Sequence, residues 1–136
     1  MSTLETITSA FDFSVHEHLE RSLEVPVHSG LQAQGDLFVI PLDSSADDRG
    51  REVPRDGIAV IPAMGAGHEH RLFASVPGTA FFRGASGDSR GDIGVLTTTE
   101  TSWLLHPEHG ATGMAPGTYM LRRQREQAQE ERIVAD

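Results

Sequence analysis

The sequence contains no cysteine, no lysine and no asparagine. Without cysteine, the chain can form neither disulfides nor thiolate metal sites, and it has no cysteine nucleophile. Without lysine, Schiff-base chemistry and P-loop phosphate binding are excluded. Without asparagine, there is no acceptor for N-linked glycosylation. Histidine and carboxylate are therefore the only strong ligands that this chain can offer a transition metal.

Long apolar runs and an excess of basic charge are also missing. No run approaches the roughly 18 apolar residues of a membrane span, and the first residues lack the basic and apolar regions of a secretory signal. Twenty acidic residues against eleven basic ones give a net charge of −9, which argues against binding a nucleic-acid backbone. We therefore expect a cytoplasmic protein that binds neither membrane nor nucleic acid.

Short apolar runs bounded by glycine and proline predict a mainly β domain within the 136 residues. Residues 37–40 and 58–61 are such runs, and each is followed by proline, as expected for buried strands bounded by turns. Repeated short strands favour a small β-barrel or a β-sandwich. Further strands are expected over residues 72–76, 80–83, 93–99, 101–105 and 118–122.

The chain divides by composition into three parts: a helical arm at residues 1–30, a β core at 31–123 and a charged tail at 124–136. Extensions of this kind often dock on neighbouring subunits or on another protein. We therefore expect a homo-oligomer or a protein partner bound through the N-terminal arm.

Two short helices are expected in the arm. Apolar residues recur at helical spacing over 4–11, and Ser2 and Glu5 have the spacing of a capping box. Ser14 and Glu17 repeat that spacing before a second run, which Pro26 ends because proline disfavours a helical preceding residue.

Two pairs among the seven histidines have the spacing of metal ligands. His68 and His70 lie two apart in a strand-rich region, and such residues share one face of a strand. His106 and His109 flank Pro107-Glu108 at the end of an apolar run, where a turn could direct both rings to one centre. We predict that these four residues bind a divalent transition metal, Zn²⁺ first, with Fe, Mn, Ni or Cu as alternatives. The alternative is four turn histidines with ordinary hydrogen bonds.

The other histidines carry less information. His16 and His18 lie two apart in a helical pattern, so their side chains point about 200° apart and an exposed position is the simpler interpretation. His28 is isolated in the sequence.

Other side chains near the histidine motifs have candidate roles. Glu69 should point to the face opposite its two neighbours, which makes it a poor ligand. Glu108 is a candidate ligand or general base, although an exposed turn carboxylate is the simpler interpretation. Tyr119 and Arg123 could position an anionic substrate, with packing and surface solvation as the respective alternatives.

Four motifs occur in a fixed order along the core. They are Gly35-Asp36-Leu37-Phe38-Val39-Ile40-Pro41, Gly67-His68-Glu69-His70, His106-Pro107-Glu108-His109-Gly110, and Pro116-Gly117-Thr118-Tyr119 leading into Arg123-Gln124-Arg125-Glu126. Residues 35–126 thereby resemble a family of small, uncharacterised bacterial and phage proteins, although Gln127 stands where that family has tyrosine. The resemblance implies a four-histidine site but no activity.

A looser similarity connects the first histidine pair to the cupins, which carry His-x-His on a barrel strand. Ala74 and Ser75 stand where a cupin has its glutamate, and Met120 lies near the position of the later histidine. The similarity implies a cupin-like barrel only if His106 and His109 replace the missing ligands.

Three functions remain open from the sequence. The first is a metal-binding small β protein, which could act as a metal-dependent hydrolase or oxygenase if one coordination position stays open. The second is a non-enzymatic assembly or interaction module, such as a phage or virion accessory. The third is a pH-responsive binding protein that uses clustered histidines.

Overall fold

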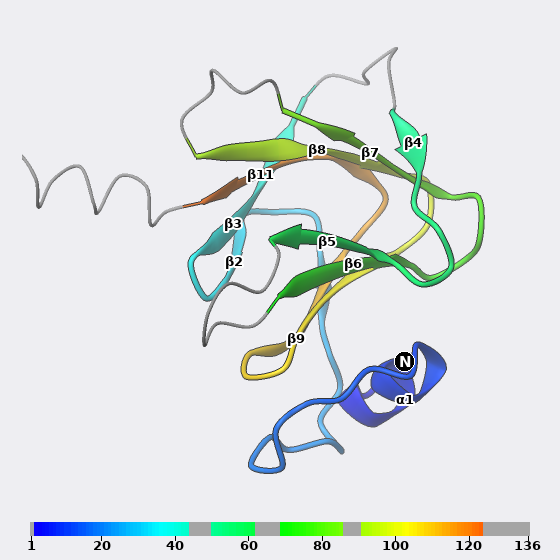
Figure 1. Ribbon diagram of the computed structural model, residues 1–136, viewed down its shortest axis with the longest axis vertical. Helices are drawn as coiled ribbons and strands as arrows, with labels where there is room; N and C mark the ends of the chain where they lie inside the picture. Colours follow the sequence, from blue (N-terminus) through cyan, green and yellow to red (C-terminus); the bar gives the residue numbers. More distant parts are fainter. Residues whose placement is uncertain (1, 44–49, 62–68, 86–90, 124–136) are drawn as a thin grey trace, which may run out of the picture.

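The computed structural model describes residues 2–43, 50–61, 69–85 and 91–123, which form one helix and eleven strands (Figure 1). None of its helices has the length and apolar character needed to span a membrane. The elements are α1 (Leu4–Ala10), β1 (Val27–His28), β2 (Gln32–Gln34), β3 (Leu37–Leu42), β4 (Arg51–Glu52), β5 (Ile58–Ile61), β6 (His70–Ala74), β7 (Ala80–Gly84), β8 (Asp92–Thr98), β9 (Ser102–His106), β10 (Gly110–Met114) and β11 (Gly117–Arg123).

The strands form two sheets that pack as a β-sandwich. One sheet has the order β1-β10-β9-β6-β5, and the other has the order β2-β3-β11-β8-β7-β4. Within the described residues no ladder joins one sheet to the other. The prediction of a mainly β fold is confirmed, and of its two variants the sandwich is observed rather than a closed barrel.

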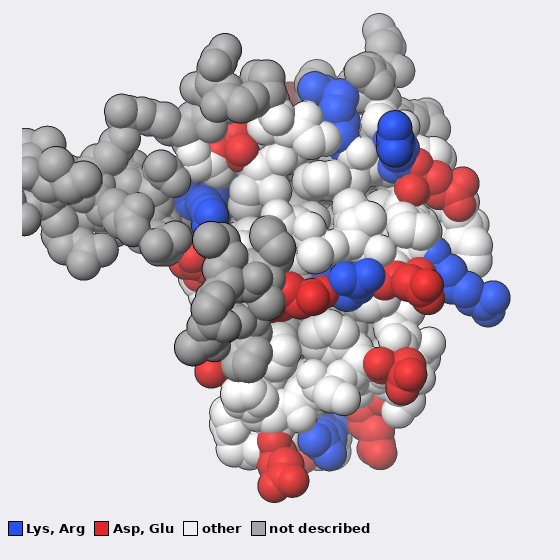
Figure 2. Space-filling model, viewed as in Figure 1, with Lys and Arg blue, Asp and Glu red and all other residues white. Residues whose placement is uncertain are grey.

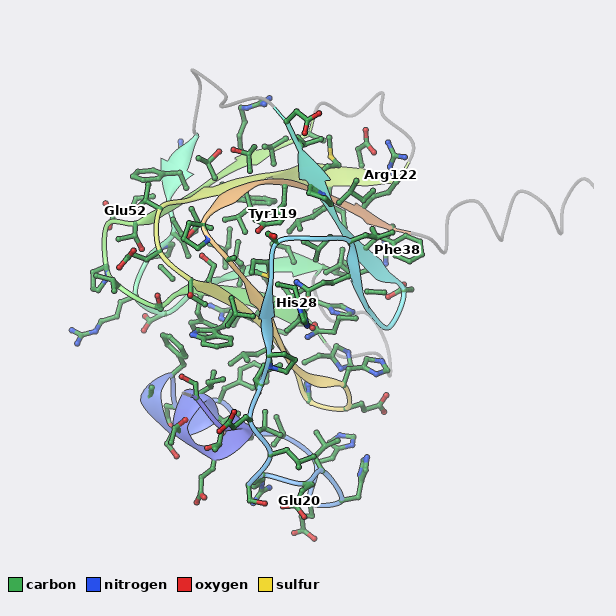
Figure 3. All side chains as sticks on the ribbon, turned by 180° about the vertical axis from the view of Figure 1, so that it is seen from behind. Glu20, His28, Phe38, Glu52, Tyr119 and Arg122 are labelled. Atoms are coloured by element: carbon green, nitrogen blue, oxygen red, sulfur yellow. The ribbon has the colours of Figure 1, made fainter. Side chains whose placement is uncertain are left out.

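The main core lies between the sheets and follows the alternation of the strands. Leu37 and Val39 of β3 are fully buried, and so is Leu121, which pairs with Val39 across the ladder. Tyr119 is 1% exposed and lies between the sheets (Figure 3), where its hydroxyl donates to the Ala115 carbonyl oxygen at 2.7 Å. Tyr119 is therefore a core residue, in agreement with the packing alternative.

A second core lies on the other face of the five-stranded sheet, beneath α1. Ile7 and Phe11 come from the arm, and the Phe11 ring stacks on Phe73 at a centroid distance of 4.4 Å. Trp103 and Leu105 of β9 complete this cluster. Because both faces of the sheet are covered, residues 103–105 form an unbroken apolar run instead of an alternating one.

The second predicted helix is wrong, because residues 14–23 form turns, bends and irregular backbone. The backbone that follows bonds to the start of the chain: Leu4 N–H donates to the Leu23 carbonyl, and Val25 N–H donates to Ser2. A helix of this length is marginal in water, and these tertiary hydrogen bonds replace it.

The first helix is present, but its cap differs from the prediction by one residue. Thr3 is the N-cap, and it forms a reciprocal capping box with Thr6, instead of the predicted pair of Ser2 and Glu5. The hydroxyl of a threonine can both donate and accept, so it fills the role expected of the glutamate.

All seven predicted strands are present, whereas four strands were not predicted: the short β1, β2 and β4, and the longest of the four, β10. The glycines of β10 hide the strand pattern, because glycine is depleted in strands. Gly113 has a packing reason: a Cβ there would lie 2.7 Å from Trp103 Cζ3 and 2.9 Å from the Pro26 carbonyl oxygen. The predicted charged tail at 124–136 lies outside the described residues.

Replacement of Ile7 by alanine tests the packing of the arm. Ile7 is 3% exposed, so we expect Ile7→Ala to lower the free energy of unfolding by about 2–4 kcal/mol, measured by urea denaturation. Val76→Ala is the matched control, because Val76 is 45% exposed and its loss should change stability by less than about 0.5 kcal/mol. Equal effects of the two variants would contradict the packing of α1.

Candidate functional site: a histidine cluster at one end of the sandwich

Three of the four predicted metal ligands meet at one end of the sandwich. The register of β6 and β9 pairs Arg71 with Leu105, so His70 and His106 are neighbours on adjacent strands, with ring centroids 4.3 Å apart. His109 lies in the β9–β10 turn, 4.5 Å from the His106 ring and 6.5 Å from the His70 ring. The fourth predicted ligand, His68, lies outside the described residues.

Strand alternation separates Glu69 from this cluster. The carboxylate of Glu69 accepts a hydrogen bond from Arg71 Nη1 at 2.7 Å. Both residues are half-buried, whereas His70 between them is 3% exposed. The prediction that Glu69 faces away from the histidines agrees with this arrangement.

The β2–β3 turn lies against the histidines, at the same side of Figure 1 as the start of β6. Gly35 has a φ of 61°, and a Cβ at this position would lie 2.8 Å from His109 Nε2. A glycine is needed here both for the left-handed backbone and for the close approach of the His109 ring. The turn thereby brings Asp36 beside His70.

Gln34 fixes the tautomer of His70. Gln34 is 3% exposed, and its Nε2 donates to the Leu104 carbonyl oxygen at 2.8 Å and to Thr112 Oγ1 at 3.1 Å. Because the Leu104 carbonyl can only accept, the amide oxygen must face His70, whose Nδ1 lies 2.9 Å away. Nδ1 of His70 is therefore the donor, and the Nε2 atom carries a lone pair when the ring is neutral.

That lone pair faces a carboxylate. Asp36 Oδ1 lies 3.5 Å from His70 Nε2, and the Asp36 side chain is 38% exposed. Burial lowers the pKa of His70, and the nearby Asp36 charge only partly opposes this shift. The neutral ring is thus favoured, and two hydrogen-bond acceptors face each other across 3.5 Å.

His106 has the opposite tautomer. Its Nδ1 accepts from the backbone N–H groups of Glu108 at 3.1 Å and of His109 at 3.3 Å. The neutral ring therefore carries its proton on Nε2. These bonds hold the β9–β10 turn against the ring, so the backbone of Glu108 contacts the cluster while its side chain is exposed.

The remaining histidines lie elsewhere in the fold. His16 and His18 contact each other at a centroid distance of 5.6 Å in the N-terminal arm, and His28 is exposed on β1 (Figure 3). Across the described ranges, no three histidine or carboxylate side chains form a group already arranged to hold a metal ion. A metal at the cluster would therefore have to draw its ligands together.

Two residues of this site were not among the predicted ligands, Gln34 and Asp36. Asp36 stands within the Gly-Asp motif that precedes the first apolar strand. A carboxylate at such a turn could have indicated a metal ligand. Gln34 gave no signal, because its role depends on the contact between two sheets.

Nitrogen NMR of the imidazole rings tests the hydrogen-bond assignments directly. At a pH where both rings are neutral, we expect His70 to be protonated at Nδ1 and His106 at Nε2. Gln34→Leu removes the acceptor for His70 and should remove its tautomer preference, with His106 unchanged as the internal control. The same tautomer in both rings of the wild-type protein would contradict these assignments.

Comparison with known proteins identifies the family. Neither the curated proteins nor the solved structures give a match. Residues 33–124 match the family model described as a domain of unknown function, DUF8820. The matched region spans β2 to β11 and contains Gln34, Asp36 and the clustered histidines. The expected membership in an uncharacterised family is thus confirmed, and the chain belongs to the DUF8820 family.

Proposed function

We propose that the histidine cluster binds one divalent transition metal ion through His70, His109 and Asp36. The observation that supports this is the placement of His70: its Nδ1 donates to the Gln34 amide oxygen while its Nε2 faces Asp36 Oδ1. Histidine ligands characteristically donate their second ring N–H to an oxygen in this way, which orients the ring. The ligand role of His68 stays a prediction from sequence.

The spacing of the two facing atoms suits a metal better than a proton. A hydrogen bond from an imidazolium to a carboxylate would be about 2.7–2.9 Å long, shorter than the 3.5 Å between His70 Nε2 and Asp36 Oδ1. Two ligands at about 2.1 Å from a tetrahedral Zn²⁺ ion lie about 3.4 Å apart. An ion between the atoms would also remove the repulsion between the two acceptors.

His106 has a positioning role in this proposal, which differs from the ligand role predicted from sequence. Its Nδ1 already accepts from two backbone N–H groups, so the single proton of the neutral ring lies on Nε2. Coordination of a metal through Nε2 would require loss of that proton. The hydrogen bonds instead hold the turn that carries His109. Glu108 contributes its backbone N–H to this turn.

The identity of the metal decides which chemistry to assay. Nitrogen and oxygen ligands in a tetrahedral spacing favour Zn²⁺, with Fe, Mn, Ni or Cu as alternatives. With an open position, Zn²⁺ would activate water for hydrolysis, whereas Fe²⁺ would support oxygen chemistry.

Metal content and Zn²⁺ titration of untagged protein test the proposal. We expect about one equivalent of metal in the wild type. His109→Ala, at an exposed position, should weaken Zn²⁺ binding by at least about 100-fold, since loss of an outer partner alone weakens binding about 10- to 100-fold. Asp36→Asn should also weaken it, because the amide carries no negative charge.

His28→Ala is the matched control, because His28 is exposed on β1 and should not change the affinity. Thermal melts of each variant separate lost binding from lost folding. Wild-type protein that takes up no Zn²⁺ would overturn the proposal, as would a variant set in which His28→Ala and His109→Ala behave alike.

Self-association is a second candidate, favoured by exposed apolar side chains in the arm and at the first residue of the core. Leu23, Val27 and Leu31 are 63%, 40% and 68% exposed. Val27 belongs to β1, the outermost strand of the five-stranded sheet among the described residues, and the edge of such a strand can pair with a second copy.

Light scattering tests this candidate with Leu31→Glu instead of a truncation, because removal of the arm would uncover Phe73. We expect a wild-type mass that is a multiple of 14.7 kDa and a monomer for the variant. A wild-type monomer would contradict self-association.

A further inference from the structure

Arg123 brings a positive charge to the end of the sandwich that holds the histidines. On β11 it pairs with Leu37, the first residue of β3, which directly follows Asp36 of the β2–β3 turn. Leu37 and Leu121 are fully buried in the core between the sheets. Directly paired residues share a face, as do residues two apart on a strand. The side chain of Arg123 therefore extends from the inner face of the six-stranded sheet.

The neighbouring Arg122 is a contrast. It pairs with Phe38 on the outer face, and the two residues lie near each other in Figure 3. Its Nε donates to Asp92 Oδ1 at 2.6 Å. Nε of Arg123, in contrast, is buried and has no hydrogen-bond partner in the described part of the chain. Buried donors without partners are rare in folded proteins.

Arg123 also lies close to the proposed ligands, because its ladder partner Leu37 directly follows Asp36 in the chain. A divalent metal at His70 and Asp36 together with the guanidinium would leave two formal positive charges in the site. An anion that contacts both would neutralise them and would give the buried Nε an acceptor.

We propose that Arg123 binds the oxyanion group of a small ligand, a carboxylate or a phosphate, one oxygen of which enters the coordination shell of the metal. The inference rests on the proposed metal site. Nε and one terminal nitrogen of a guanidinium form a planar fork that matches two oxygens of such a group. The class of ligand is thus a small acid rather than a neutral molecule.

Anion titrations of the Co²⁺-loaded protein test this inference, because an oxygen that joins the metal changes the visible spectrum of Co²⁺. The probes are phosphate and oxalate, with urea as the neutral control. We expect both anions to change the spectrum of the wild type. Arg123→Gln should weaken anion binding by about 10- to 100-fold and leave the Co²⁺ affinity within about threefold.

Arg122→Gln is the matched control and should bind both anions like the wild type, because Arg122 faces outward. Arg123→Lys keeps the charge without the fork, should give an intermediate loss, and serves if Arg123→Gln does not fold. Co²⁺ binding with equal anion affinity in the wild type and the Arg123 variants would overturn this inference alone. Failure of the wild type to bind Co²⁺ would overturn the metal site and this inference with it.

Discussion

The side-chain amide of Gln34 joins the two sheets at the end where the histidines meet. Its nitrogen donates to β9 and β10, and its oxygen accepts from His70 on β6. One buried side chain from the six-stranded sheet thus satisfies groups on three strands of the other sheet. Because leaving any of these groups unpaired would cost about 1–3 kcal/mol, the amide fixes both the approach of the sheets and the orientation of the His70 ring.

The covering of the five-stranded sheet explains why the site lies at an end of the sandwich. Its outer face packs against α1 through Phe73 and Trp103, and its inner face packs against the other sheet. The histidines of this sheet gather where its strands end, His70 at the start of β6 and His106 at the end of β9. On the face drawn in Figure 2, acidic and basic residues are interspersed without a basic patch.

The sequence predicts those parts of the structure that depend on local pattern. Residues 58–61 are recognisable as a strand because β-branched residues lie between turn residues, and His70 and His106 are recognisable because each lies at a strand end. The contact between the two rings depends on the pairing of β6 with β9, which spacing does not give. The failed helix at 14–23 and the role of Gln34 have the same cause, since hydrogen bonds between distant segments decide both.

The central claim is that a metal ion lies between His70 Nε2 and Asp36 Oδ1, and a crystal soaked in Zn²⁺ tests it most directly. X-ray data at the zinc absorption edge locate the ion by its anomalous signal. We expect one strong peak about 2.0–2.2 Å from both atoms, with His109 turned toward it. A peak at another set of ligands, or no peak at full soaking, would contradict the assignment of this site.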